Sequence, residues 1–232
     1  MVSRQDLVTL SAAAALGGGL MAIAFSAGAH WNQLQSLRPN GNAAACLSKV
    51  SSTHKPDPFN PSKREGYLSW DDYFMSIAFL SAKRSKDPNR QVGACIVSQD
   101  RVILGIGYNG FPRGCSDDEL PWAKVSVHGD PLETKYPYVC HAEVNAILNK
   151  NHASAAGQRL YVTLFPCNEC AKVIIQAGIA EVVYFADKGV HTDNKIGGNE
   201  TAYVASRKLL AMAGVKVWQH QPVAKMLVLE FK

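Results

Sequence analysis

The sequence lacks the features that would assign it to a specialised class of protein. It has no internal repeat, and its six cysteines form no dense framework of the kind that stabilises small secreted domains. This cysteine usage predicts a reducing compartment. With 47% hydrophobic and 19% charged residues, the composition is typical of a globular protein, and 232 residues suit one domain with an appendage.

A strong bias in charge is missing too. The formal net charge of +5 suits anionic small molecules as well as nucleic acid, so it does not distinguish between these partners. The function must therefore be inferred from motifs rather than from composition.

One histidine, two cysteines and a glutamate stand at the spacing of a catalytic zinc site. His141-x-Glu143 is followed by Pro166-Cys167-x-x-Cys170, a pattern typical of zinc nucleobase deaminases. Catalytic zinc keeps three protein ligands and leaves the fourth position to water, whose pKa it lowers toward neutrality. We therefore predict Zn²⁺ as the cofactor, His141, Cys167 and Cys170 as its ligands, and Glu143 as the catalytic acid and base.

Two other interpretations of the cysteine pair have less support. A redox pair would need a thioredoxin-like context, which the surrounding sequence does not provide. A structural zinc site would need a fourth ligand, and the nearest candidate is Cys140. Because adjacent residues rarely both reach one ion, we predict that Cys140 is a small buried side chain instead.

The local pattern favours a site built at two helix N-termini. Val144, Ile147 and Leu148 give residues 141–149 an apolar helical stripe. Pro166 is suited to the start of a second helix at 168–177. The positive ends of two such helices would favour thiolates at the metal.

Residues 1–66 differ from the rest and are predicted to be an N-terminal extension and linker. Segment 7–29 carries no charge and is long enough to span a bilayer, but Ala, Gly and Ser dominate it. A transit peptide would be richer in Arg, and secretion would conflict with an intracellular zinc-thiolate enzyme. We expect a disordered or loosely helical extension on a cytoplasmic protein, with a membrane anchor or an organelle-targeting peptide as alternatives.

Residues 67–232 are predicted to form the catalytic domain. Ser69 resembles the N-cap of a helix that runs to about Ser85. Its predicted buried face consists of Tyr73, Ile77 and Leu80, with Phe74, Ala78 and Ser81 beside them. Runs at 92–98 and 101–107 predict a hairpin. Further strands are expected at 160–164, 181–186, 215–219 and 226–231, and a helix at 200–212. This order implies one mixed sheet with helices on both faces.

A long irregular segment, residues 108–139, separates the hairpin from the zinc motif. Segments of this length inside a compact domain usually carry function. Asn109 stands at the end of a strand, where substrate contacts tend to lie. Arg113, Lys124 and Lys135 are candidates to meet a phosphate, with a solvated surface charge as the alternative for each.

Several motifs together resemble the deoxycytidylate deaminase family. They are Ser69-Trp-Asp-Asp-Tyr-Phe-Met, Gly105-Ile-Gly-Tyr-Asn-Gly, Asp117-Asp118, Pro121-Trp122, residues 134–147 and residues 161–178. The resemblance covers 67–232, and the extension looks most like that of the plant members. It implies an α/β fold of the three-layer α/β/α cytidine-deaminase type with a central mixed five-stranded sheet.

The resemblance also implies an activity. The family deaminates dCMP hydrolytically to dUMP and ammonia with a zinc-activated water, which supplies dUMP for thymidylate synthesis. The implied roles are metal ligands for His141, Cys167 and Cys170, proton transfer for Glu143 and a substrate contact for Asn109. A homo-oligomer is implied as well, typically a hexamer activated by dCTP with Mg²⁺ and inhibited by dTTP.

The chain departs from the family at Gly189, where several members carry an aromatic residue near the substrate phosphate. We predict that Lys188 replaces this contact and that Arg113 is a second cation at the substrate.

Two functions of other classes fit parts of the sequence. A tRNA adenosine deaminase shares the zinc motif but needs a basic surface, whereas this chain carries acidic residues near the site, so we predict no nucleic-acid partner. The acidic residues are Asp117, Asp118, Glu119, Asp130 and Glu133. A zinc-stabilised scaffold would not need Glu143. Free cytidine deaminases usually carry Cys in place of His141, which disfavours a nucleoside substrate.

Overall fold

The computed structural model describes residues 57–187, 198–224 and 226–229. Contacts divide the chain into the units Met1–Ser62 and Lys63–Lys232, and the second unit holds every element described below. No helix in the described ranges combines the length and apolar character needed to cross a membrane. The predictions for segment 7–29 lie outside the described residues.

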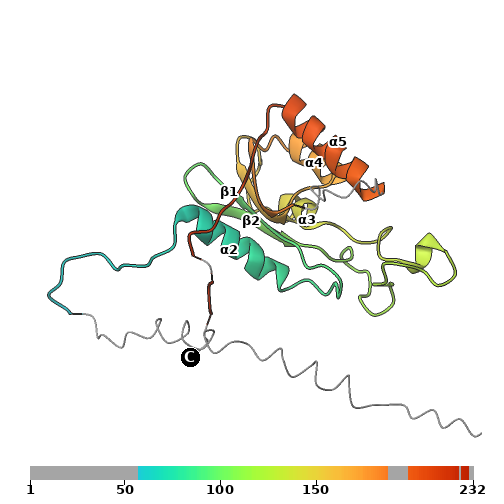
Figure 1. Ribbon diagram of the computed structural model, residues 1–232, viewed down its shortest axis with the longest axis horizontal. Coiled ribbons are helices and arrows are strands. Elements are labelled where there is room, and N and C mark those ends of the chain that lie inside the picture. The colour runs from blue at the N-terminus through green and yellow to red at the C-terminus, as the bar shows by residue number, and fades with distance from the viewer. Residues whose placement is uncertain (1–56, 188–197, 225, 230–232) are drawn as a thin grey trace, which may run out of the picture. The chain divides into compact units, whose positions relative to one another are not determined.

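A mixed sheet of five strands forms the centre of this unit (Figure 1). The strands are β1 (Gly93–Val97), β2 (Ile103–Tyr108), β3 (Arg159–Leu164), β4 (Glu181–Ala186) and β5 (Lys216–Gln219), in the order β2-β1-β3-β4-β5. β1 pairs antiparallel with β2 and β3, whereas β3, β4 and β5 run parallel. The predicted hairpin and the mixed five-stranded sheet are confirmed.

Helices cover both faces of the sheet, because each strand turns alternate side chains to opposite sides (Figure 1). Helix α2 (Trp70–Ala82) packs on the face that carries Cys95, Val97, Tyr161 and Val183. Helices α3 (Ala142–Leu148), α4 (Asn168–Gln176) and α5 (Gly198–Met212) pack on the face that carries Ala94, Ile96, Leu160, Val162 and Val182. The predicted three-layer α/β/α architecture is confirmed.

Helix α2 begins where the sequence predicts, but it buries only part of the predicted face. The Ser69 side chain accepts a hydrogen bond from the N–H of Asp72 at 3.1 Å, which caps the helix. The helix ends at Ala82, three residues before the predicted end. The predicted buried face is wrong for Tyr73 and Leu80, since Leu80 is 51% exposed. The prediction is confirmed for Phe74, Ala78 and Ser81, which are buried together with Met75 and Ala82.

The reason is a close approach between α2 and β1. A Cβ on Gly93 would lie 1.9 Å from the carbonyl oxygen of Ala78 and 2.5 Å from the nitrogen of Ala82. Because the helix backbone touches the strand here, only small residues fit along the contact line. This orientation turns Leu80 and Tyr73 outward.

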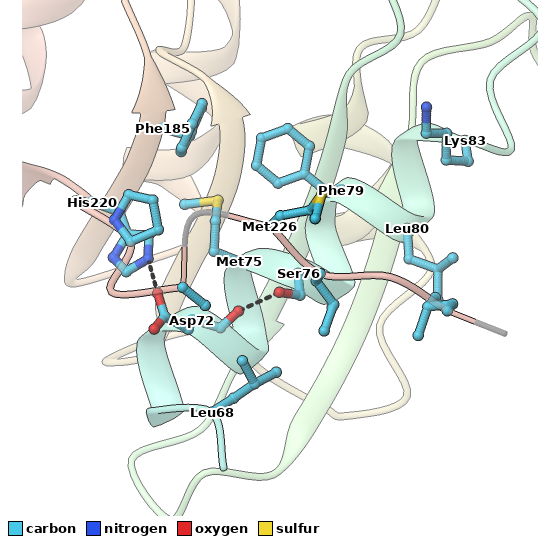
Figure 2. Close-up of a pocket in the computed structure, with 14 residues that line it drawn as sticks. Leu68, Asp72, Met75, Ser76, Phe79, Leu80, Lys83, Phe185, His220 and Met226 are labelled. Carbon is cyan, nitrogen blue, oxygen red and sulfur yellow. Dashed lines mark hydrogen bonds and ion pairs between the residues drawn. The ribbon is translucent and has the colours of Figure 1, made fainter. Parts of the chain in front are cut away.

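The C-terminal residues cross α2 instead of adding a strand to the sheet (Figure 2). His220 Nε2 lies 2.8 Å from Asp72 Oδ1, which also accepts the N–H of Val223 at 3.3 Å. Met226, Leu227 and Leu229 line a cavity of about 370 Å³ together with side chains of α2. The prediction of a strand at 226–231 is therefore wrong for its described residues, which line this cavity with side chains of α2 instead.

Helix α3 crosses β2 at Gly107 with no space for a side chain. A Cβ at Gly107 would lie 2.2 Å from the carbonyl oxygen of Ala142 and 2.3 Å from the nitrogen of Ala146. The side-chain amide of Asn145 fixes the same contact by donating to the carbonyl of Tyr108 at 2.7 Å. This crossing sets the position of the first turn of α3.

We expect Gly107→Ala to lower the free energy of unfolding by about 1–3 kcal/mol. The added methyl group would clash with backbone atoms of α3, which can move away only if the whole helix shifts. Denaturant unfolding measures the change. Gly110→Ala is the matched control, since a Cβ there meets only a ring carbon of Tyr108 at 3.9 Å. Equal stabilities for the two variants would contradict the close crossing.

Candidate active site

The structure brings the three predicted zinc ligands together at the starts of two helices. His141 is the N-cap of α3 and Cys167 is the N-cap of α4, while Cys170 lies in the first turn of α4. His141 Nδ1 lies 3.3 Å from the sulfur of Cys170 and 3.4 Å from that of Cys167. All three donor atoms lie within 4.8 Å of one another.

These distances suit one tetrahedral zinc ion. Bond lengths of about 2.0 Å to nitrogen and 2.3 Å to sulfur place two tetrahedral ligands about 3.5 Å apart. In the described part of the chain no fourth His, Cys, Asp or Glu joins the group. A set of three donors with a free fourth position is the arrangement of catalytic rather than structural zinc.

Cys140 does not belong to the ligand set. Its backbone N–H and C=O pair with those of Gly110 at 2.8 and 3.1 Å, so it holds the long segment against the start of α3. Cys140 is not among the three residues whose donor atoms lie together, and its exclusion as a ligand stays a prediction. The prediction that it is buried is wrong, because the residue is only partly buried.

The pKa values of the two cysteines are shifted in opposite directions by the hydrogen bond between them. A hydrogen bond from the Cys170 thiol lowers the pKa of Cys167 to about 4, although burial opposes the shift. The same hydrogen bond and burial raise the pKa of Cys170. Thiolate is the form that binds metal, so Cys167 has the protonation state of a ligand, and Cys170 would have to release a proton to bind a metal ion.

Glu143 lies beside the ligands without joining them. Its carboxyl group is buried, with 4% of the residue exposed, and burial raises its pKa. Cys170 is a hydrogen-bond partner of Glu143. A buried carboxyl with a raised pKa, next to a metal site, is suited to proton transfer near neutral pH.

Glu143 reaches this place because α3 turns a particular face inward. Ala142, Glu143, Ala146 and Ile147 are buried, which brings the carboxyl group under the zinc ligands. The predicted apolar stripe is wrong for Leu148, which is exposed at the end of the helix. The crossing at Gly107 determines this face.

A cavity of about 230 Å³ opens next to the metal ligands. It is lined by His141, Glu143 and Cys167 together with residues from distant parts of the chain. These include Asp87, Arg90, Asn109, Lys124, Lys135, Tyr136, Phe165 and Tyr203. The cavity therefore combines a proton-transfer group, a metal site, aromatic rings and cations.

Asn109 lies in this cavity, but its side chain is already bound to protein groups. Its amide nitrogen donates to Asp87 Oδ2 at 3.1 Å and to the carbonyl of Arg90 at 3.0 Å. Its amide oxygen accepts the N–H of Val92 at 2.8 Å. One lone pair of that oxygen remains for a substrate, so a contact to substrate stays a prediction.

Of the two predicted substrate cations, Arg113 and Lys188, the structure describes only Arg113. Arg113 is not among the residues that line the cavity, and its guanidinium donates to the side chain of Asn149 beyond α3. Lys188 lies outside the described residues. Both roles stay predictions.

Sequence reasoning missed the contribution of residues 87–92 and of Tyr203. Asp87, Asn89 and Arg90, in the loop that follows α2, all line the cavity. Tyr203 of α5 joins them, and burial raises its pKa to about 12. No local signal marks these residues, because only the folded chain brings them to the site.

Comparison with known proteins agrees with this geometry. The model of the cytidine and deoxycytidylate deaminase zinc-binding region matches residues 68–186. The chain belongs to this family. The predicted resemblance, and the prediction that the protein is an enzyme of this family, are confirmed.

Individual relatives share most of the domain. The deoxycytidylate deaminase of Homo sapiens is 54% identical over 169 residues, which cover 73% of this chain and 89% of that protein. The probable deoxycytidylate deaminase of Drosophila melanogaster is 52% identical over 188 residues, or 80% and 85% of the two chains. The crystal structure of the dCMP deaminase from cyanophage S-TIM5 in complex with dCMP and dUMP has a TM-score of 0.48 and 27% identity, covering 64% of this chain and 95% of that one.

We expect Glu143→Gln to keep one zinc per chain and to lose activity by at least about 10²–10⁴-fold, because the amide retains the shape but cannot transfer the proton. Metal content and ammonia release measure the two properties separately. Glu169→Gln is the matched control, since this exposed glutamate lies between the two cysteines and bonds to Lys172. Loss of zinc together with activity in Glu143→Gln would show that Glu143 is a ligand.

Proposed function

We propose that the protein catalyses the hydrolytic deamination of dCMP to dUMP and ammonia. The observation that carries the proposal is a buried Glu143 in contact with a His-Cys-Cys set, at the wall of a cavity that also contains cations. Relatives more than half identical to this chain are named deoxycytidylate deaminases, which supports dCMP as the substrate.

The chain's own residues account for the proton transfers. Zinc, held by His141, Cys167 and Cys170, supplies an activated water when it is bound. Glu143 accepts a proton from the attacking water and delivers it to N3 of the cytosine ring. After the remaining hydroxide adds at C4, Glu143 takes the proton of the new C4 hydroxyl group and passes it to the amino nitrogen, so that a C4 carbonyl forms and ammonia leaves. The burial of Glu143 supports this role, because it keeps competing solvent away from the carboxyl group.

Phosphate recognition is assigned to the cations at the cavity. Arg90 and Lys124 line it and, among the described residues, neither forms an ion pair. Lys135 also lines the cavity, but its ammonium group is paired with Asp87. The positive charges of Arg90 and Lys124 are therefore available for a phosphate. These two residues are added to Arg113 and Lys188 as candidates for phosphate binding.

Assembly and regulation are proposed from the resemblance. Tyr73, Phe79 and Leu80 expose apolar surface on α2, which supports association into a homo-oligomer such as a hexamer. Activation by dCTP with Mg²⁺, inhibition by dTTP and a cytoplasmic role in supplying dUMP for thymidylate synthesis complete the proposal. The acidic side chains of Asp117 and Asp118 support a partner other than nucleic acid.

Ammonia release from dCMP, CMP, deoxycytidine and an RNA hairpin tests the proposed function. We expect the zinc-loaded protein to deaminate dCMP fastest, because only this substrate presents both a deoxyribose and a phosphate to the cavity. Deamination of deoxycytidine as fast as dCMP would make a nucleoside the better substrate. Activity on the hairpin alone would indicate an RNA deaminase.

We expect Arg90→Met and Lys124→Met each to lower kcat/KM for dCMP about 10- to 100-fold, because each loses one charge-assisted hydrogen bond to phosphate. The rate on deoxycytidine, which has no phosphate, should hardly change. Lys172→Met on the exposed surface of α4 is the control. Equal losses on both substrates would place phosphate recognition elsewhere.

A further inference from the structure

A buried ion pair joins Asp87 and Lys135 at the wall of the cavity. The side chain of Asp87 is 1% exposed and that of Lys135 is 6% exposed, so both charges are removed from water. The two residues are separated by 48 positions in the sequence. Neither has a role in the proton transfers assigned to Glu143.

The Asp87 carboxylate is fully occupied. Its Oδ1 accepts the backbone N–H of Asn89 at 2.8 Å and that of Arg90 at 3.2 Å. Its Oδ2 accepts from the ammonium group of Lys135 and from the side-chain amide of Asn109. Burial alone would raise the pKa of Asp87, but these hydrogen bonds outweigh burial and hold the pKa below its usual value. The group is therefore ionised at neutral pH.

Three separate segments meet at this carboxylate. The first is the loop 87–92 after α2, which carries Arg90. The second is the end of β2 at Asn109, whose side chain also binds the backbone of Arg90 and Val92. The third is the stretch around Lys135, whose carbonyl accepts the N–H groups of residues 138 and 139 just before the zinc motif. Each segment forms part of the cavity wall.

Stability alone does not explain the pair. Taking two charges out of water is costly, and well-packed apolar residues often replace a buried ion pair without loss of stability. The pair is neutral as a unit, so it adds little net attraction for an anion. The pair can instead fix the backbone of Arg90. The Arg90 N–H donates to the Asp87 carboxylate, and the Arg90 C=O accepts from the side-chain amide of Asn109, which also donates to that carboxylate.

We propose that the Asp87–Lys135 ion pair is a positioning device that holds the loop 87–92, and with it Arg90, against the zinc-ligand set, and so determines selectivity for a substrate with a phosphate. The proposal rests on the proposed dCMP deaminase function. Lys135 is a positioning residue in this account, and Arg90 is the group that meets the phosphate.

The test compares Asp87→Asn, Lys135→Met and the double variant with wild type, on dCMP and deoxycytidine. Each single variant leaves one buried charge unpaired, so we expect its Tm to fall on the order of 10 °C. We expect KM for dCMP to rise roughly 10- to 100-fold, because a displacement of about 1 Å is enough for such a loss. The ratio of kcat/KM for dCMP to that for deoxycytidine should fall by a similar factor, with one zinc per chain.

The double variant separates positioning from folding. It contains no unpaired buried charge, so its Tm should recover above that of either single variant. KM for dCMP should remain raised, because the loop is no longer held. Recovery of KM together with Tm would overturn the proposal and leave the pair a purely structural role. An unchanged selectivity ratio in all three variants would overturn it as well.

Two controls make the result specific. Lys172→Met removes a lysine from an exposed pair with Glu169 on α4 and should leave KM unchanged. The wild-type protein shows whether dCMP is the substrate at all. If wild type fails to deaminate dCMP, the proposed function itself is wrong. If wild type is active and the variants keep its selectivity, only the role of the ion pair is wrong.

Discussion

The site depends on the contact between the imidazole of His141 and the sulfurs of Cys167 and Cys170. This contact requires α3 and α4 to begin at the same place on one face of the sheet. The close crossing at Gly107 sets α3, while α4 follows directly from the central strand β3. Once these two helix starts meet, Glu143, the second residue of α3, is buried beside the predicted zinc ligands. The geometry of the candidate site is therefore a consequence of where the two helices begin on the sheet.

Much of this could be predicted because the signals are local. The zinc motif depends on spacings of two or three residues, and the hairpin, the strands and the Ser69 cap depend on short patterns. The orientation of α2 could not be predicted in this way. Its buried face follows from backbone contact with Gly93 on the next strand, which the helix's own pattern does not reveal, so the apolar residue Leu80 is left outside although its spacing favours burial.

The substrate side of the cavity was the least predictable part for the same reason. Asp87, Asn109 and Lys135 come from three segments and meet only in the folded chain. In the sequence, Asp87 before a proline indicates a helix stop, and Lys135 is one of many surface-type cations. Burial shows that these residues have a structural role, because a buried charge requires a hydrogen-bonding or ion-pair partner. Here the partners lie on different segments of the cavity wall and so connect those segments. The sequence thus predicted which histidine and cysteines would meet, and it named Asn109, Lys124 and Lys135 of the cavity wall, but it did not indicate Asp87, Arg90 or Tyr203.

The central claim is that zinc here has three protein ligands and an open fourth position. X-ray absorption at the zinc edge of the full-length protein, loaded with one zinc per chain, tests it most directly. The account predicts two sulfur ligands at about 2.3 Å and two nitrogen or oxygen ligands at about 2.0–2.1 Å. In a Glu143→Gln variant the same shell should persist, since Glu143 binds no metal. A third sulfur, as from Cys140, or a change in the shell when Glu143 is replaced, would contradict the account.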